Sequence, residues 1–216
     1  MQRSMAEALS ITASELILGG QRSGKSRRAE LLAREWLAQS PQHKAVLIAT
    51  GQPWDDEMRE RIARHQLDRA ERVPGMTTVE EPLALAEAIS RSSDEDTLVV
   101  VDCLTLWLTN LLMPAESPET AQKAPKTTKN GQISDEKMAE SQYPRAEAAM
   151  VLIAIEKAAG PVILVGNEIG LGVIPMGRET RAFVDALGQL NQQVAATCQC
   201  VTLMAAGLPL TLKGQA

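Results

Sequence analysis

The chain has 216 residues, of which 44% are hydrophobic but only 2% are aromatic, so its core must be built from Leu, Val, Ile, Ala and Met. This length suits one domain, and this composition suits a buried, mostly parallel α/β sheet. The net charge of −5 weakly disfavours nucleic acid as a partner, and no apolar run approaches the roughly 18 residues of a membrane span, so we expect neither kind of partner.

The first 14 residues and the cysteines bear on location. Residues 1–14 lack the apolar core of a secretory signal and predict a flexible N-terminal extension before a domain at 15–214. Three cysteines, an odd and low number, indicate a reducing, cytoplasmic location. Cys198 and Cys200 form a C-x-C pair without a further Cys or His close in sequence, so we interpret them as small buried hydrophobic side chains.

The first predicted elements frame a phosphate-binding motif. Residues 15–20, ELILGG, predict a buried strand, and residues 25–40 predict a helix. Between them GGQRSGKS matches G-x-x-x-x-G-K-[ST], in which backbone N–H groups cradle phosphates, the lysine reaches the β- and γ-phosphates, and the serine ligates Mg²⁺. The expected phosphate-binding residues are Gly19, Gly20, Gln21, Arg22, Ser23, Gly24, Lys25 and Ser26, with Ser26 also a metal ligand.

Further along, apolar runs alternate with helical patterns, which predicts a doubly wound, mostly parallel sheet. The polar segment 114–144 lacks periodicity and predicts a surface insertion. Strands are expected at 44–51, 76–82, from 96 and at 160–168, helices at 55–70, 82–92, 104–113, 145–160 and 180–198, and two last strands within 200–214, broken at 207–209.

Asp102 ends the buried run TLVVVD, at the edge of a parallel sheet where ligands bind. A carboxylate there holds Mg²⁺ directly or through water in proteins with this phosphate loop. The alternative is an acid that only caps the following helix.

The two histidines differ in setting. His43 lies in a polar loop and is expected to be exposed and inert. His65 follows Met58 and Ile62 at helical spacing, so it belongs near the apolar face of its helix. It is either a partly buried histidine bonded to a neighbour, or a nucleophile that attacks the α-phosphorus of a nucleotide while nearby arginines neutralise charge.

Five stretches in this order resemble one enzyme family: LILGGQRSGKSRRAE, IATGQPWDDEMRERIARHQ, VVVDCLTLWLTNLL, GNEIGLGVIPMGRETRAFVDALGQLNQ and AAGLPLTLKG. Together they resemble the bifunctional adenosylcobinamide kinases / adenosylcobinamide-phosphate guanylyltransferases of cobalamin biosynthesis. The resemblance implies a single-domain, RecA-like P-loop fold and a homotrimer. It implies Mg²⁺, with GTP and ATP as substrates beside adenosylcobinamide and adenosylcobinamide phosphate.

Two reactions follow from the resemblance. A nucleoside triphosphate phosphorylates the aminopropanol hydroxyl of adenosylcobinamide. GTP then transfers GMP to a histidine, which passes it to adenosylcobinamide phosphate to give adenosylcobinamide-GDP. The histidine corresponds to His65. Because an imidazole must be neutral to attack, guanylylation should weaken below about pH 6.5.

The resemblance also assigns residues to the nucleotide site. Catalysis falls to His65 and Lys25. One carboxylate could accept from both N1–H and the exocyclic amine of guanine, and whether Glu80 or Asp102 does so stays open. The loop 167–181 is expected to help hold the corrinoid or the nucleotide, since it follows a strand at the ligand edge. Further nucleotide-site residues are Ala49, Thr50, Gly51, Gln66, Leu67, Asp68, Arg69, Glu80 and Asp102.

Two rival functions stay open. One is a small-metabolite kinase without nucleotidyl transfer, in which His65 is structural. The other is a non-catalytic protein whose interaction surface is switched by nucleotide binding. A covalent GMP adduct would exclude the first, and turnover of adenosylcobinamide would exclude the second.

Overall fold

The computed structural model describes residues 10–53, 56–113 and 135–214, with the backbone alone at 57, 58, 61, 65 and 135–143. Across these ranges no helix combines the length and apolar character that a membrane crossing would need. Of the N-terminal extension expected at 1–14, residues 1–9 lie outside the described residues.

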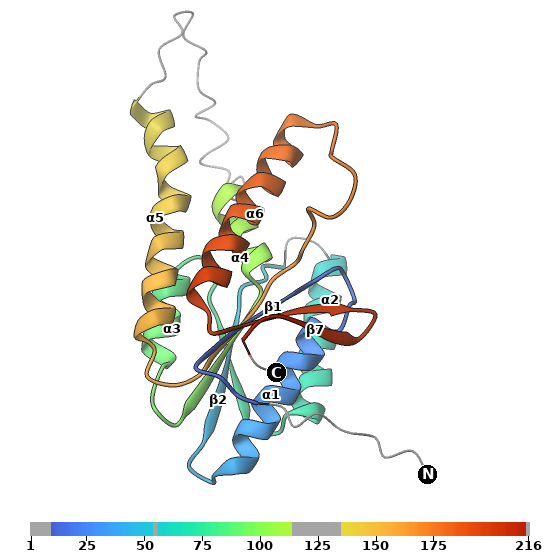
Figure 1. Cartoon of the computed structure of the whole chain (residues 1–216), viewed down its shortest axis with the longest axis vertical. Helices are drawn as coiled ribbons and strands as arrows, with labels where there is room; N and C mark the ends of the chain where they lie inside the picture. Colours follow the sequence, from blue (N-terminus) through green and yellow to red (C-terminus); the bar gives the residue numbers. More distant parts are fainter. Residues whose placement is uncertain (1–9, 54–55, 114–134, 215–216) are drawn as a thin grey trace, which may run out of the picture.

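The described strands form one twisted sheet (Figure 1). Their order across the sheet is β3-β2-β4-β5-β1-β6-β7. The first six pair in parallel, and β7 runs antiparallel to β6 after a turn at Ala206 and Gly207. The strand β5 therefore lies between β1 and β4, which carry the phosphate loop and Asp102. The strands are β1 (Ser14–Gly19), β2 (Lys44–Ala49), β3 (Met76–Glu80), β4 (Thr97–Asp102), β5 (Val162–Val165), β6 (Cys200–Ala205) and β7 (Leu208–Lys213).

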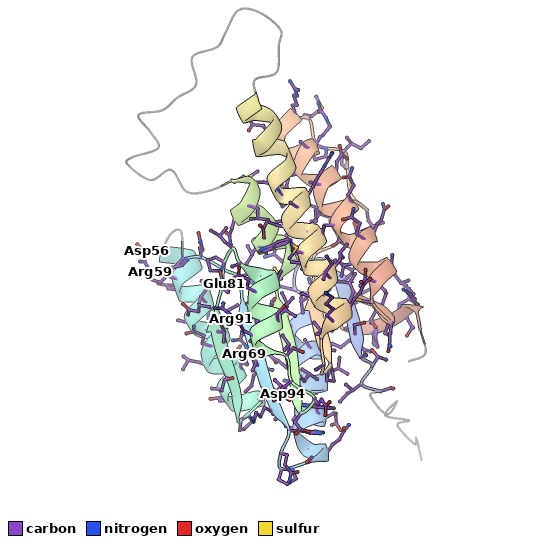
Figure 2. All side chains as sticks on the ribbon, turned by 90° about the vertical axis from the view of Figure 1, so that its left-hand side faces the viewer. Asp56, Arg59, Arg69, Glu81, Arg91 and Asp94 are labelled. Carbon is purple, nitrogen blue, oxygen red and sulfur yellow. The ribbon has the colours of Figure 1, made fainter. Side chains whose placement is uncertain are left out.

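Helices cover both faces of the sheet. On one face α1 packs through Ala29 and Leu32, and on the other α3, α4, α5 and α6 pack through side chains such as Trp107 and Leu187. On this second face α5 contacts both α3 and α6 (Figure 2). The helices are α1 (Lys25–Gln39), α2 (Asp56–Arg72), α3 (Leu85–Ser92), α4 (Leu104–Leu112), α5 (Asp135–Lys157) and α6 (Arg178–Thr197).

Adjacent residues of the central strands enter opposite cores. Leu16 packs in the cluster under α4 and α6, whereas Ile17 packs in the cluster under α1, and both are fully buried. This alternation is what a pleated strand with helices on both sides requires, and it explains why β1 and β4 are apolar almost throughout. The expected class, a doubly wound, mostly parallel α/β sheet, is confirmed.

One expected boundary is wrong. The helix expected from 145 begins at Asp135, so residues 135–144 of the segment expected to lack regular structure are helical, and Pro144 lies inside the helix. The polar sequence and this proline hid the first part of α5, because both lower the helical signal. The rest of the expected insertion, 114–134, lies outside the described residues.

Candidate active site

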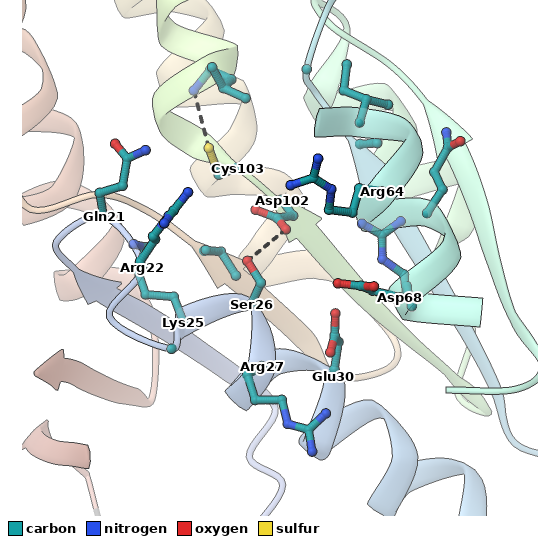
Figure 3. Close-up of a pocket in the computed structure, with 18 of the residues that line it drawn as sticks. Gln21, Arg22, Lys25, Ser26, Arg27, Glu30, Arg64, Asp68, Asp102 and Cys103 are labelled. Carbon is teal, nitrogen blue, oxygen red and sulfur yellow. Dashed lines mark hydrogen bonds between the residues drawn. The ribbon is translucent and has the colours of Figure 1, made fainter. Parts of the chain in front are cut away.

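The carboxyl ends of the parallel strands meet at one edge of the sheet, around a cavity of about 930 Å³ (Figure 3). The phosphate loop after β1 borders it on one side, and α2 borders it on the other. Most of the residues expected at the nucleotide site line this cavity: Gln21, Arg22, Ser23, Gly24, Lys25, Ser26, Ala49, Gly51, Gln66, Asp68, Arg69, Glu80 and Asp102.

The phosphate loop turns tightly because three of its residues adopt positive φ. These are Gly19 (150°), Arg22 (55°) and Gly24 (104°). At Gly19 a Cβ atom would collide with the Met204 carbonyl oxygen, so only glycine fits there. Gly19 and Gly20 shape the loop without lining the cavity itself.

The loop opens directly into α1. The N-cap residue is Gly24, which has no side chain that could accept from the first N–H groups of the helix. These N–H groups are therefore left for a ligand. Lys25 Nζ donates to the Gly20 carbonyl at 2.7 Å, which folds the lysine back over the loop. The Ser23 hydroxyl is buried and has no hydrogen-bond partner among the described residues. Such a cradle of donors fits phosphate oxygens.

The two expected metal ligands are in contact. Ser26 Oγ, on α1, donates to Asp102 Oδ2, at the end of β4, over 3.1 Å (Figure 3). A hydroxyl and a carboxylate beside a phosphate cradle are the few hard oxygen ligands that Mg²⁺ takes from a protein when phosphates complete its shell. In the described part of the chain no cluster of three His, Cys, Asp or Glu offers a rival cation site. The residues therefore fit a phosphate-bound Mg²⁺.

Thr50 lies behind the cavity and does not line it. Its hydroxyl donates to the Cys103 carbonyl at 2.7 Å and accepts from the Cys103 N–H at 2.9 Å, and the residue is fully buried. Asn110 Nδ2 donates to the Thr50 carbonyl at 2.8 Å. Thr50 thus links the end of β2 to Cys103, the residue that follows Asp102. Its structural role is to fix the backbone next to Asp102.

Cys103 caps α4 by accepting from the Leu106 N–H through Sγ. Burial, helped by the negative charge of Asp102, raises the pKa of the Cys103 thiol to about 11. The thiol therefore stays protonated at neutral pH and is a poor nucleophile, although it borders the cavity.

The helix α2 forms the wall opposite the phosphate loop. Arg64, Gln66, Asp68 and Arg69 line the cavity, whereas Leu67 is 70% exposed and does not. Figure 3 shows Arg64 and Asp68 reaching from α2 towards the loop side. The backbone of His65 lies in this helix between Arg64 and Gln66, and its side chain lies outside the described residues.

An ion-pair network that the sequence did not predict joins this wall to α1. Arg72 donates to Glu30 Oε2 on α1 and to Asp68 Oδ2 on α2, each over 3.3 Å. Glu30 lies four residues after Ser26, so its position on the same helix face could have been noticed. The bond to Arg72 could not, because it spans two helices.

The two candidate guanine acids stand at different places along the sheet edge. Asp102 is paired with Ser26 at the phosphate loop. Glu80 ends β3, the edge strand, and accepts a hydrogen bond from Gln66 Nε2 at 3.4 Å. Only Glu80 therefore lies away from the phosphate cradle and beside the His65 region of α2.

The family model and the sequence relatives agree on one family. Residues 15–212 match the family model described as "Cobinamide kinase / cobinamide phosphate guanyltransferase". The chain is 43% identical to the bifunctional adenosylcobalamin biosynthesis protein CobP of Pseudomonas aeruginosa, over 93% of this chain and 98% of that protein. It is 34% identical to the bifunctional adenosylcobalamin biosynthesis protein CobU of Escherichia coli, over 92% of this chain and 98% of that protein. Among solved structures, the flagellar accessory protein FlaH of Methanocaldococcus jannaschii aligns over 94% of this chain and 79% of its own with a TM-score of 0.45 and 11% identity.

Proposed function

Because the chain belongs to the cobinamide kinase / cobinamide phosphate guanyltransferase family, we propose that the cavity at its sheet edge carries out both reactions, each on its own bound nucleoside triphosphate. The protein is a transferase of cobalamin biosynthesis. The observation that carries the proposal is that the phosphate loop and the α2 residues on either side of His65 line one cavity.

In the kinase reaction, the phosphate loop and Lys25 hold the triphosphate while its γ-phosphoryl group passes to the aminopropanol hydroxyl of adenosylcobinamide. In the guanylylation, a ring nitrogen of His65 forms a bond to the α-phosphorus of GTP. The α–β P–O bond breaks, and pyrophosphate leaves from the same cradle. An oxygen of adenosylcobinamide phosphate then displaces the histidine. Such transfers depend mainly on positioning and on charge stabilisation.

Mg²⁺, held by Ser26 and Asp102, would neutralise charge that develops on the phosphates. On the far side, Arg64 and Arg69 face the same cavity and would stabilise negative charge at the α-phosphate. The homotrimeric assembly and the cytoplasmic location expected from the sequence are part of the proposal.

We assign guanine recognition to Glu80. Asp102 accepts a hydrogen bond from Ser26 beside the phosphate loop. Glu80 ends the edge strand β3 and accepts only a long hydrogen bond, from Gln66 at 3.4 Å, among the described residues. A carboxylate there can accept both N–H donors of guanine, and an adenine offers no such pair. Glu80→Gln should therefore lower guanylylation by GTP on the order of tenfold or more, since it replaces one acceptor by a donor. Glu87→Gln, an exposed acid on α3, is the matched control.

The test of the whole proposal is covalent labelling. The protein is incubated with α-labelled GTP and Mg²⁺ and denatured, and the label that stays on the chain is counted. We expect acid-labile, alkali-stable label that His65→Ala abolishes and His43→Ala keeps. His43 is a fair control because it lies outside the cavity, stacked on Trp36 with ring centroids 3.7 Å apart.

Absence of label from a protein that binds GTP would contradict the proposed guanylyl transfer through His65. It would leave the rival small-metabolite kinase, whose turnover needs no covalent intermediate. Label on His65→Ala equal to that on the native chain would instead reject His65 as the nucleophile.

A further inference from the structure

The residues just after β5 form a buried polar junction that the reactions above do not use. Asn167 lines the cavity, two residues beyond the end of β5. Because β5 lies between β1 and β4, Asn167 stands between the phosphate loop and Asp102. It therefore borders the place where the terminal phosphates of a bound triphosphate would lie.

The backbone of Asn167 is held from both sides. Its N–H donates to Thr105 Oγ1 on α4 at 2.8 Å, and its carbonyl accepts from Asn191 Nδ2 on α6 at 3.1 Å. The neighbouring N–H groups of Gly166 and Glu168 donate to the Ile17 and Gly19 carbonyls, both at 3.0 Å. Asn167 is thus fixed against the start of the phosphate loop.

The two supporting side chains are unusual for their surroundings. Thr105 and Asn191 are 8% and 5% exposed, on helices whose neighbouring buried residues are apolar. Asn191 Oδ1 is buried with no hydrogen-bond partner among the described residues. Burying polar groups in this way costs stability, so their presence needs a compensating role. Fixing the backbone of Asn167 is the role that their bonds show.

The side-chain amide of Asn167, in contrast, forms no hydrogen bond to another described residue. The backbone of Asn167 is held by two hydrogen bonds and its neighbours by two more, whereas its half-buried side-chain amide is uncommitted, so this amide is positioned for a ligand. The ligand at this point of the cradle is anionic, and an amide N–H donates well to a phosphate oxygen.

We propose that Asn167 is a further catalytic residue, which donates its side-chain N–H to the γ-phosphate of the bound triphosphate. In the kinase reaction this contact would stabilise the phosphoryl group in transfer, and in the guanylylation it would hold the leaving pyrophosphate. Thr105 and Asn191 are positioning residues that act through Asn167. The inference rests on the proposed use of this cavity for GTP.

The test compares ligands that differ in their terminal phosphates. Affinities for α,β-methylene-GTP, which cannot guanylylate His65, and for GMP are measured by calorimetry with Mg²⁺. Asn167→Asp should weaken binding of the triphosphate on the order of tenfold or more, because a carboxylate replaces a donor and repels the phosphate. Its affinity for GMP should stay unchanged. Asn167→Ala should show the same pattern to a smaller degree.

Gln193→Glu is the matched control, since it makes the same amide-to-carboxylate change at an exposed site of α6 outside the cavity. It should bind both nucleotides as the native chain does. Thr105→Val, which removes the hydroxyl that accepts from Asn167, should also weaken the triphosphate selectively. A merely structural role would weaken both nucleotides alike.

The outcomes separate the two proposals. Equal losses for both nucleotides, or none, in folded Asn167→Asp and Asn167→Ala would overturn the role of Asn167 alone. A native chain that binds no GTP would reject the proposed function as well. If Asn167→Asp does not fold, as judged by circular dichroism, Asn167→Ala decides by the same comparison.

Discussion

Ser26 and Asp102 are 76 positions apart in the chain, yet the serine hydroxyl donates to the aspartate carboxylate over 3.1 Å. One comes from the first turn of α1, and the other ends β4. The pair joins the phosphate cradle to the neighbouring strand end, so a change in either residue should alter how the site handles a cation.

Asp102→Asn should reduce both reactions on the order of 100-fold, because the uncharged amide is a weaker cation ligand and stabilises less charge in the transition state. Rates measured across a Mg²⁺ titration should need more Mg²⁺ to saturate. Nucleotide binding without Mg²⁺ should be unchanged. A mutant with native rates and native Mg²⁺ dependence would show that Asp102 is not a cation ligand.

Gly19→Ala should destabilise the protein and prevent nucleotide binding. Gly19 has a φ of 150°, and an added Cβ would meet the Met204 carbonyl and the Ser23 hydroxyl. Backbone strain and overpacking together should cost about 2–4 kcal/mol in the free energy of unfolding. Urea denaturation measures this cost. Gly20→Ala is the control, since a Cβ there meets nothing within 4 Å, and an equal loss in that variant would refute the steric argument.

Glu15 on β1 and Arg28 on α1 form a largely buried ion pair. Arg28 Nε donates to Glu15 Oε1 at 2.8 Å, and Thr202 Oγ1 donates to the same oxygen at 2.8 Å. Glu15→Ala should cost about 3–5 kcal/mol in the free energy of unfolding, because it leaves the Arg28 charge buried and unpaired. The double variant Glu15→Met, Arg28→Met should recover much of this loss. A double variant no more stable than the single one would argue against an unpaired charge as the cause.

The buried thiols should make the protein less stable at alkaline pH. Burial raises the pKa of Cys103 from 9.0 to about 11 and that of Cys198 from 9.0 to about 12. Above pH 9 the unfolded chain loses these protons while the folded chain keeps them, so unfolding is favoured as pH rises towards 11–12. Each thiol contributes a slope of at most about 1.4 kcal/mol per pH unit.

Denaturation curves at pH 8, 9 and 10 should show this decline, with a shallower slope in Cys198→Ala. All three cysteines are buried, so alkylation at pH 8 should require unfolding. Rapid alkylation of the folded chain, or the same slope in Cys198→Ala, would contradict the assignment of the decline to these thiols.

The sequence was informative wherever a property is local. The phosphate loop lies within eight residues, and Asp102 is marked by the apolar strand before it, so the position of both at the ligand edge of the sheet was predictable. The burial of Thr50 behind the cavity could not be predicted, because it depends on hydrogen bonds to Cys103, 53 positions away. The Arg72 network depends on the packing of two helices, and the first turns of α5 are polar. None of these leaves a periodic signal in the sequence.

The strand order also sets a length scale across the site. The phosphate loop follows β1 and Glu80 ends β3, and four strand spacings separate these strands in the order β3-β2-β4-β5-β1. At about 4.8 Å for each spacing the two ends lie about 19 Å apart across the sheet. A nucleotide that engages both must therefore lie stretched across the strand ends, with its base at the outer edge. The width of the sheet would then select for a molecule with a full triphosphate and a base that Glu80 can bind. The α-phosphorus of such a molecule would lie between the phosphate loop and Glu80, next to α2.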